Sequence, residues 1–149
     1  MWKRFPVQAL LLAGMLAAAG LAACSRTPPE QALRERIELL QRNIDARDAG
    51  EVASALAEDF VGNQGMDRRE AQRTATGLFL RYRDVGATFG PLQVQMQGDT
   101  HATVKFTVAA TGGAGGMLPS DAQVYDVTTG WRSGDDGWQM TSADWTPRF

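Results

Sequence analysis

Two aspartates on the expected C-terminal strands have the residue type and the placement for acid–base chemistry. Asp126 shares the alternation of Val124. Asp144 shares the alternation of Trp138 and Met140. Both carboxylates could face the apolar side of a sheet if each alternation is unbroken, and a pair there could act as general acid and general base. A β-bulge, or a place in water near a strand end, would leave either carboxylate without that role.

The sole histidine and the glycine-rich run are weaker candidates. His101 lies beside the expected turn Gly98-Asp99-Thr100, so we interpret it as an exposed turn residue that completes no nucleophilic triad. The run at positions 112–116 contains four glycines and one alanine, and no Gly-Lys-Ser/Thr follows it. We interpret this run as a hairpin loop closed by Pro119, not as a phosphate cradle.

Metal and cofactor sites are not expected. The chain has one cysteine and one histidine, and the pair Asp135-Asp136 belongs to an expected turn, so no spacing typical of metal ligands is present. An apolar ligand cavity could use Tyr82, Trp138 and Met140, although packing in the core is the alternative for each.

Arginine is dense on the expected third helix. These side chains could contact lipid phosphates, and a solvated helix face balanced by nearby acids is the alternative. The arginines are Arg68, Arg69, Arg73, Arg81 and Arg83.

The one cysteine, Cys24, ends the only long apolar run of the chain. A basic Lys3-Arg4 pair precedes an uncharged stretch from Ala9 to Ala23, which is typical of an export signal. An uncleaved membrane helix is the alternative. The length argues against it, because the stretch has 15 residues and a spanning helix needs ~20.

The segment Leu21-Ala22-Ala23-Cys24 resembles the lipobox of bacterial lipoproteins. The resemblance implies that the thiol of Cys24 receives a diacylglyceryl group, that residues 1–23 are removed, and that the new amino terminus is acylated. Several acyl chains hold a protein on a bilayer because each buried methylene contributes ~0.8 kcal/mol. Ser25 stands where the family uses aspartate for inner-membrane retention, so the resemblance implies the periplasmic side of an outer membrane.

Charge and length define the rest of the chain. Loss of Lys3 and Arg4 leaves 13 basic residues against 17 acidic ones, a net charge of about −4 that does not favour nucleic-acid binding. We expect residues 24–29 to form a tether and residues 30–149 to form one domain.

The first half of this domain has helical periodicity. Thr27, Pro28 and Glu30 form a helix-start signal, and Gly50 is the expected stop. The buried stripe of this helix is expected at Leu33, Ile37, Leu40 and Ile44, and a shorter helix follows with Val52, Leu56 and Phe60.

A capping box at Asp67 and Glu70 predicts the start of a third, longer helix. Its buried side is expected at Ala71, Ala75, Leu78, Tyr82 and Val85.

After Gly86 the apolar period changes from about 3.6 to 2, which predicts strands. The expected strands are 92–97, 102–110, 122–131 and 138–146, joined by turn-rich segments at 98–100 and 133–137. Helices followed by a meander predict an α+β domain with N-terminal helices packed on a curved antiparallel sheet of four or more strands.

The element order resembles the nuclear transport factor 2-like (NTF2-like), or SnoaL-like, superfamily. The resemblance also rests on the segment from Ala55 to Phe60 and on the closing strand Gly137-Trp138-Gln139-Met140. It implies a sheet that wraps a cone-shaped cavity and a short first strand near 60–63. The superfamily contains isomerases, cyclases, dehydratases and proteins without a reaction, and its enzymes usually place an aspartate or histidine in the cavity.

Three hypotheses follow for function. The first is a lipid-anchored, non-enzymatic module that binds a small apolar ligand or a protein; the second is an isomerase- or dehydratase-like enzyme that uses Asp126 or Asp144. The third is a homodimer through a sheet face that carries glutamines at 93, 95 and 97. An enzyme should bury a carboxylate in an open pocket, whereas a binding module should have a filled or purely apolar interior.

Overall fold

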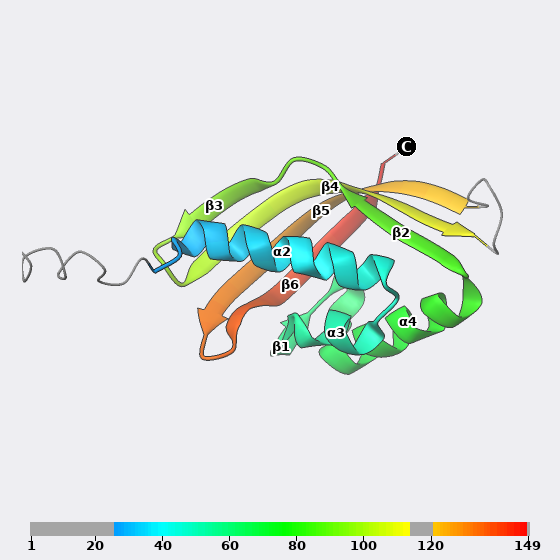
Figure 1. Ribbon diagram of the computed structural model, residues 1–149, viewed down its shortest axis with the longest axis horizontal. Helices are drawn as coiled ribbons and strands as arrows, with labels where there is room; N and C mark the ends of the chain where they lie inside the picture. Colours follow the sequence, from blue (N-terminus) through cyan, green and yellow to red (C-terminus); the bar gives the residue numbers. More distant parts are fainter. Residues whose placement is uncertain (1–25, 114–120, 149) are drawn as a thin grey trace, which may run out of the picture.

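The computed structural model describes residues 26–113 and 121–148, and in it a strongly curved six-stranded sheet wraps around three α-helices (Figure 1). The helices are α2 (Pro29–Asp45), α3 (Ala49–Ser54) and α4 (Arg68–Arg81), with a short 3-10 turn, η2 (Asn63–Gly65), before α4. The strands are β1 (Leu56–Val61), β2 (Asp84–Phe89), β3 (Gln93–Gln97), β4 (His101–Gly113), β5 (Asp121–Gly134) and β6 (Gly137–Pro147).

Helix α2 presents the expected apolar stripe to the sheet, but both of its ends differ from the sequence prediction. Leu33, Ile37 and Leu40 are buried, as predicted. The N-cap is Pro28 without a side-chain cap, so the predicted Thr27 cap is wrong. The helix ends at Asp45, before the predicted stop at Gly50, because a tight turn that contains a residue with positive φ follows it directly.

That turn is made by Arg47, whose φ is 57°, and it leads directly into α3. The Asp48 carboxylate caps α3 by accepting a hydrogen bond from the Glu51 N–H at 2.9 Å. Gly50 therefore lies inside α3 and does not terminate a helix.

The expected helical segment from Val52 to Phe60 is a helix for only its first residues. From Leu56 the chain becomes β1, which pairs in parallel with β6. The predicted helix was wrong here because the pairing partner lies more than 80 residues away in sequence, beyond the reach of a local periodicity. The first strand implied by the family resemblance is present, starting earlier than expected.

Helix α4 begins with the predicted capping box. The Asp67 carboxylate accepts from the Glu70 N–H at 2.8 Å, and the Glu70 carboxylate accepts from the Asp67 N–H at 3.0 Å. The predicted buried face is only partly confirmed: Ala71 packs against the core, whereas Leu78 is 46% exposed. Val85 is not helical, because the chain becomes extended after Arg81 and enters β2.

The sheet has the order β1-β6-β5-β4-β2, and β3 also pairs with β4. Strands β3 to β6 form the predicted antiparallel meander, and the parallel β1 makes the sheet mixed. Strands β2 and β3 share one edge of β4, joined where the Gly90 N–H donates to the Thr107 carbonyl at 2.8 Å. The long strands β4 and β5 extend beyond the part of the sheet that α2 covers (Figure 1).

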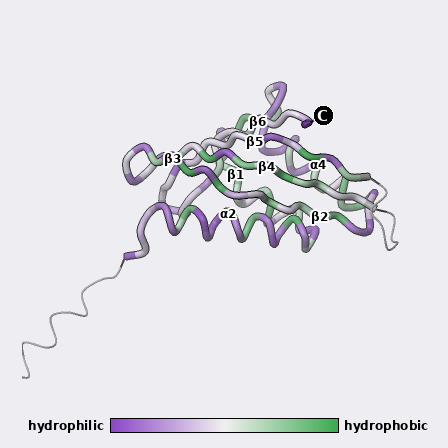
Figure 2. The backbone as a smooth tube through the Cα atoms, turned by 90° about the horizontal axis from the view of Figure 1, so that it is seen from above, coloured by the Kyte–Doolittle hydropathy of each residue, from purple (hydrophilic) through white to green (hydrophobic). Residues whose placement is uncertain are grey.

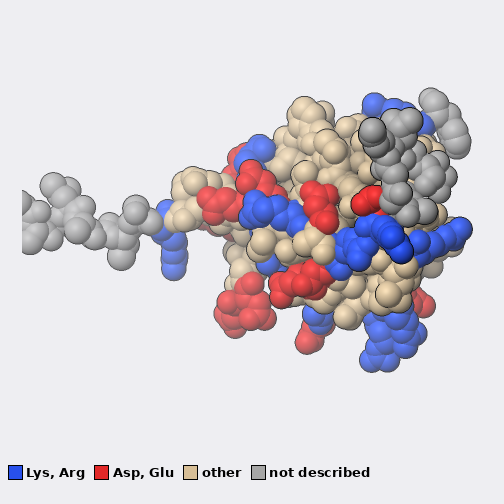
Figure 3. Space-filling view, turned by 45° about the vertical axis from the view of Figure 1, so that its right-hand side comes forward, with Lys and Arg blue, Asp and Glu red and all other residues tan. Residues whose placement is uncertain are grey.

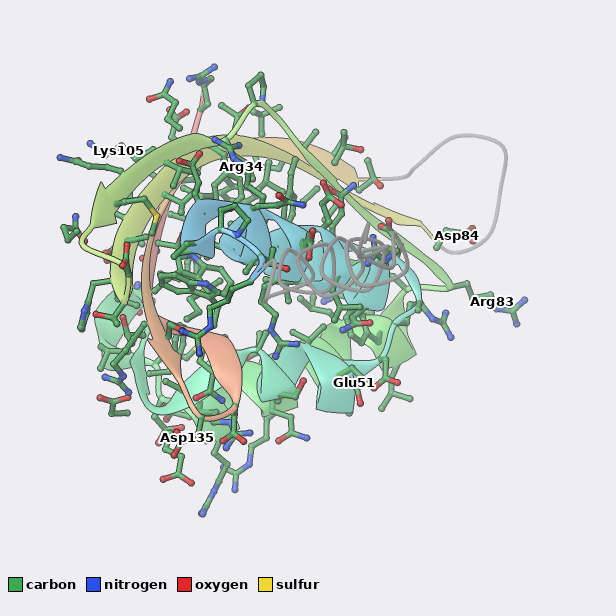
Figure 4. All side chains as sticks on the ribbon, turned by 60° about the vertical axis from the view of Figure 1, so that its left-hand side comes forward. Arg34, Glu51, Arg83, Asp84, Lys105 and Asp135 are labelled. Carbon is green, nitrogen blue, oxygen red and sulfur yellow. The ribbon has the colours of Figure 1, made fainter. Side chains whose placement is uncertain are left out.

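The core lies between α2 and the concave face of the sheet. The view nearly along α2 shows the sheet curving around the helix, with Glu51, Arg83, Lys105 and Asp135 pointing outward (Figure 4). Along the tube, apolar stretches of the strands alternate with polar ones (Figure 2). Trp131, Trp138 and Met140 are buried there together with the stripe of α2.

Candidate functional site

A hollow of about 360 Å³ opens on the concave side where the sheet extends past α2. We call it the Tyr82 pocket. Its walls are the end of α4, the start of β2, and the facing ends of β4 and β5. The residues that line it are Leu78, Tyr82, Val85, Gly86, Ala110, Thr111, Gly112, Ala122, Gln123 and Tyr125.

Small residues on the strands create this space. Ala110 and Gly112 occupy positions of β4 that share the side of Val108 and Phe106. A Cβ atom on Gly112 would lie 3.2 Å from the Tyr82 ring, so glycine allows the ring to approach the strand closely. The pocket therefore results from missing side-chain volume on the sheet beside a large ring on the helix end.

The wall of the pocket is fixed by Arg47 from the α2–α3 turn. Its guanidinium donates to the carbonyl oxygens of Tyr82 at 3.2 Å and Arg83 at 2.6 Å, where α4 ends. The Arg81 guanidinium carbon lies 5.3 Å from the centroid of the Tyr82 ring. These contacts hold the ring in place, while Leu78 gives the rim an exposed apolar side chain.

Among the described residues that line the pocket there is no carboxylate and no histidine. Two phenol groups, from Tyr82 and Tyr125, and the amide of Gln123 supply its polar side-chain groups together with the hydroxyl of Thr111. Such a lining can bind an apolar or amphipathic molecule.

Deeper in the cone the space is filled by side chains. Trp131, Trp138 and Met140 are 2%, 5% and 6% exposed. Among the residues whose burial is described, Thr129 is the one buried polar residue, and it is fully satisfied: its hydroxyl accepts from the Trp131 indole at 2.8 Å and donates to the Val104 carbonyl at 3.2 Å. The interior is therefore an apolar core rather than an open catalytic cavity.

Asp126 does not face the apolar side as the alternation suggested. It is exposed on the convex face, and its carboxylate accepts two hydrogen bonds from the Arg148 guanidinium at 2.6 and 3.2 Å. The expectation was wrong because Val127, Thr129 and Trp131 define the core side of β5, and Asp126 alternates with them.

Asp144 is also exposed, for a different reason. Gly130 pairs with Ser142 and Trp131 with Met140, so Thr141 is an extra residue in β6. This β-bulge reverses the alternation, and Asp144 points to water. Gly130 accommodates the bulge, since a Cβ there would lie 2.6 Å from the Ser142 hydroxyl oxygen.

Every aspartate and glutamate whose exposure the structure describes is exposed to solvent. His101 is exposed at the start of β4, as predicted, with its Nδ1 3.0 Å from the Thr100 hydroxyl. Within the described residues, no three histidine, cysteine, aspartate or glutamate side chains gather closely enough to hold a metal ion. The described groups thus offer no buried acid or base.

The remaining predicted sites separate into three groups. Tyr82 lines the pocket, whereas Trp138 and Met140 are core residues. Gly112 lies in β4, and the rest of the expected loop, from 114 on, lies outside the described residues, as does Cys24. Four of the predicted arginines, Arg68, Arg69, Arg73 and Arg81, lie in α4, and Arg83 lies between α4 and β2. Figure 3 shows a face of the molecule on which basic and acidic side chains are interspersed.

Sequence reasoning missed the pocket positions Gly86, Ala110 and Tyr125. Ala110 ends the alternating series of β4, and a shift to small residues after Val108 was the available signal. Val85 and Gly86 could not be placed because β2 was not predicted.

An exposed ion pair fastens the opposite end of the sheet. The Arg132 guanidinium donates to both Asp59 carboxylate oxygens, at 2.8 and 3.1 Å, linking β5 to β1. This hydrogen bond holds the pKa of Asp59 below its ordinary value, and the carboxylate raises the pKa of Arg132.

Several solved structures resemble this fold. Bd1075 from Bdellovibrio bacteriovorus matches with a TM-score of 0.69 and 14% identity, over 79% of this chain and 41% of that one. A protein provisionally assigned as a scytalone dehydratase from Novosphingobium aromaticivorans matches with a TM-score of 0.68 and 15% identity, over 80% and 84%. A protein provisionally assigned as a dehydratase of the NTF2-like family from Streptomyces avermitilis matches with 0.68 and 16%, over 83% and 99%.

No protein-family model matches the sequence, and a search of curated proteins finds no match either. At 14–16% identity the likenesses show the fold and not the activity. The chain has an NTF2-like fold, with three helices packed on a mixed, curved, six-stranded sheet.

Proposed function

We propose that this protein is a non-enzymatic binding module that holds a small apolar or amphipathic ligand in the Tyr82 pocket. The observation that carries the proposal is the pocket itself: about 360 Å³, open to solvent, lined mainly by apolar and aromatic groups with a few neutral polar ones. Its volume falls within the ~300–1,000 Å³ of small-molecule sites. A neutral lining favours a ligand without a net charge at the part it buries.

The names of two structural neighbours raise dehydratase activity as the alternative, in which Asp126 or Asp144 would act on substrate. Acid–base catalysis at neutral pH calls for a group with a shifted pKa beside the bound substrate. Both carboxylates are exposed, and neither lines the Tyr82 pocket. Binding is therefore the better-supported function.

The proposal includes a lipid anchor at Cys24, which would place the domain on the periplasmic side of an outer membrane. It rests on the segment Leu21-Ala22-Ala23-Cys24 after the apolar run, and on the close spacing between Cys24 and the start of α2 at Pro29. Within the part of the chain that the structure describes, no helix is long and apolar enough to cross a bilayer. Attachment through acyl chains fits the segment that ends at Cys24.

The binding proposal is tested by filling the pocket. Ala110→Trp places an indole into the hollow, whereas Ala109→Trp places the same group on the opposite face of β4. A chain spanning residues 26–149 is titrated with anilinonaphthalene sulfonate, excited outside the tryptophan band. We expect the wild type and Ala109→Trp to bind the probe, and Ala110→Trp to bind at least about tenfold more weakly.

Two controls make this result interpretable. All three chains should unfold cooperatively in urea, which excludes probe binding by a loosened core. Equal binding by Ala110→Trp and Ala109→Trp, or no binding by the folded wild type, would contradict the proposal.

A further inference from the structure

Strand β3 is a free edge of the sheet. Its five residues pair with β4 on one side, from Gln93 opposite Lys105 to Gln97 opposite His101. No described strand pairs with its other side, and Figure 1 shows β3 at the upper rim of the sheet with α2 below it. Alternate backbone N–H and C=O groups of β3 therefore point away from the sheet.

This edge lacks the charges, proline and bulge that often prevent edge-to-edge pairing. The segment Gln93-Val94-Gln95-Met96-Gln97 has no charge and no proline, and its register with β4 is unbroken. The other two edge strands differ: β1 carries Glu58 and Asp59, and β2 begins with Asp84. Only the β3 edge, among the described strands, combines free backbone groups with full neutrality.

The segment is also self-complementary. Read from either end about Gln95, it alternates glutamine with an apolar residue. An antiparallel second copy would place Gln95 opposite Gln95, Gln93 opposite Gln97, and Val94 opposite Met96. Amides would then face amides on the exposed side, and the half-buried Val94 and Met96 would meet on the core side.

Space and charge also suit a second copy. A hollow of about 240 Å³ borders β3 on its exposed side, lined by Gln93, Val94, Gln95, Thr103 and Lys105. It can receive glutamine side chains from a partner. Lys105 is the one charge in its lining, and it would lie more than three strand spacings, over roughly 14 Å, from its copy.

We propose that two copies of this chain associate through β3, antiparallel, about a two-fold axis at Gln95. The contact is isologous, so it closes after two chains. A five-residue strand pair buries far less than the ~1,600 Å² of stable complexes, and the dimer is therefore weak and depends on concentration. This dimer uses the sheet edge, not the sheet face, and it is independent of ligand binding.

The two-fold axis gives a sharp test by sedimentation equilibrium of the full chain in a non-ionic detergent. Gln95→Lys places two like-charged side chains directly opposite each other across the axis, with Cβ atoms about 5 Å apart, and so does Gln95→Glu. We expect each variant to weaken dimerisation about tenfold or more. An equimolar mixture of the two variants pairs opposite charges and restores association to the wild-type level or above.

Gln31→Lys is the matched control, because it makes the same substitution on the exposed face of α2, beside Glu35. It should dimerise like the wild type. Restored association in the mixture also shows that both Gln95 variants are folded. A wild type that stays monomeric at every concentration, a Gln95→Lys chain that dimerises normally, or a mixture no tighter than its components would each overturn the proposal.

Discussion

Replacing Thr129 by valine removes one hydroxyl from the centre of the core and keeps the side-chain shape. Thr129 is 1% exposed, and its hydroxyl oxygen accepts the hydrogen bond of the Trp131 indole at 2.8 Å. Trp131 is itself buried, so no water can replace the lost acceptor. Valine thus leaves a buried N–H donor without a partner.

The magnitude follows from two opposing effects. An unsatisfied buried donor costs ~1–3 kcal/mol. The added methyl group of valine returns up to ~0.8 kcal/mol through apolar burial. We therefore expect the free energy of unfolding to fall by about 1–2 kcal/mol, which lowers the urea midpoint by roughly 0.5–1 M for an m-value of ~2 kcal/mol/M.

The assay is urea unfolding followed by tryptophan fluorescence and circular dichroism. Thr128→Val is the control, since Thr128 is the neighbouring residue on the opposite face of β5. In a Trp131→Phe background the indole N–H is absent, and Thr129→Val should then cost much less. Equal costs for Thr129→Val and Thr128→Val would refute the account of this hydrogen bond.

Three further predictions concern the ion pair, the helix cap and the anchor. The lowered pKa of Asp59 means that its pairing with Arg132 stabilises the fold at neutral pH, and that this stabilisation is lost as the pH falls through the lowered pKa. The melting temperature of Asp59→Asn should therefore lie below that of the wild type at neutral pH and converge with it in acid. A constant difference at all pH values would contradict this. Asp67→Ala removes the capping box with Glu70 and should cost about 1 kcal/mol in urea unfolding, where an unchanged midpoint would show that the cap is dispensable. Cys24→Ala should leave the protein unprocessed and without acyl mass in cell fractions, and identical membrane association and mass in both chains would contradict lipidation.

Local signals predicted the elements whose cause is local. The capping box at Asp67 and Glu70 depends on residues three apart, and the stripe of α2 depends on one helix period, so both were confirmed. The meander of β3 to β6 was visible because hairpin turns join neighbouring segments.

Features set by distant contacts could not be predicted. Strand β1 exists because β6 pairs with it in parallel, and β2 exists because it adds to the far half of β4. The bulge at Thr141 depends on how β5 and β6 align, so the alternation that placed Asp144 inside failed after one extra residue. For Asp126 the alternation was regular, and the error lay in which face of β5 was taken as the core.

The pocket was beyond sequence reasoning for a related reason. Its walls come from four elements, and its volume is the space left by Gly86, Ala110 and Gly112. Absent side chains become informative only when the elements around them are known. Tyr82, Trp138 and Met140 were proposed from the sequence as possible ligand contacts. Of these three, Tyr82 lines the pocket.

Native mass spectrometry of the full chain, purified from the cells that produce it, tests the central claim most directly. The account predicts that the wild type and Ala109→Trp retain a small apolar or amphipathic molecule, and that Ala110→Trp does not. A wild type free of any such molecule, or the same molecule bound equally to Ala110→Trp, would contradict it.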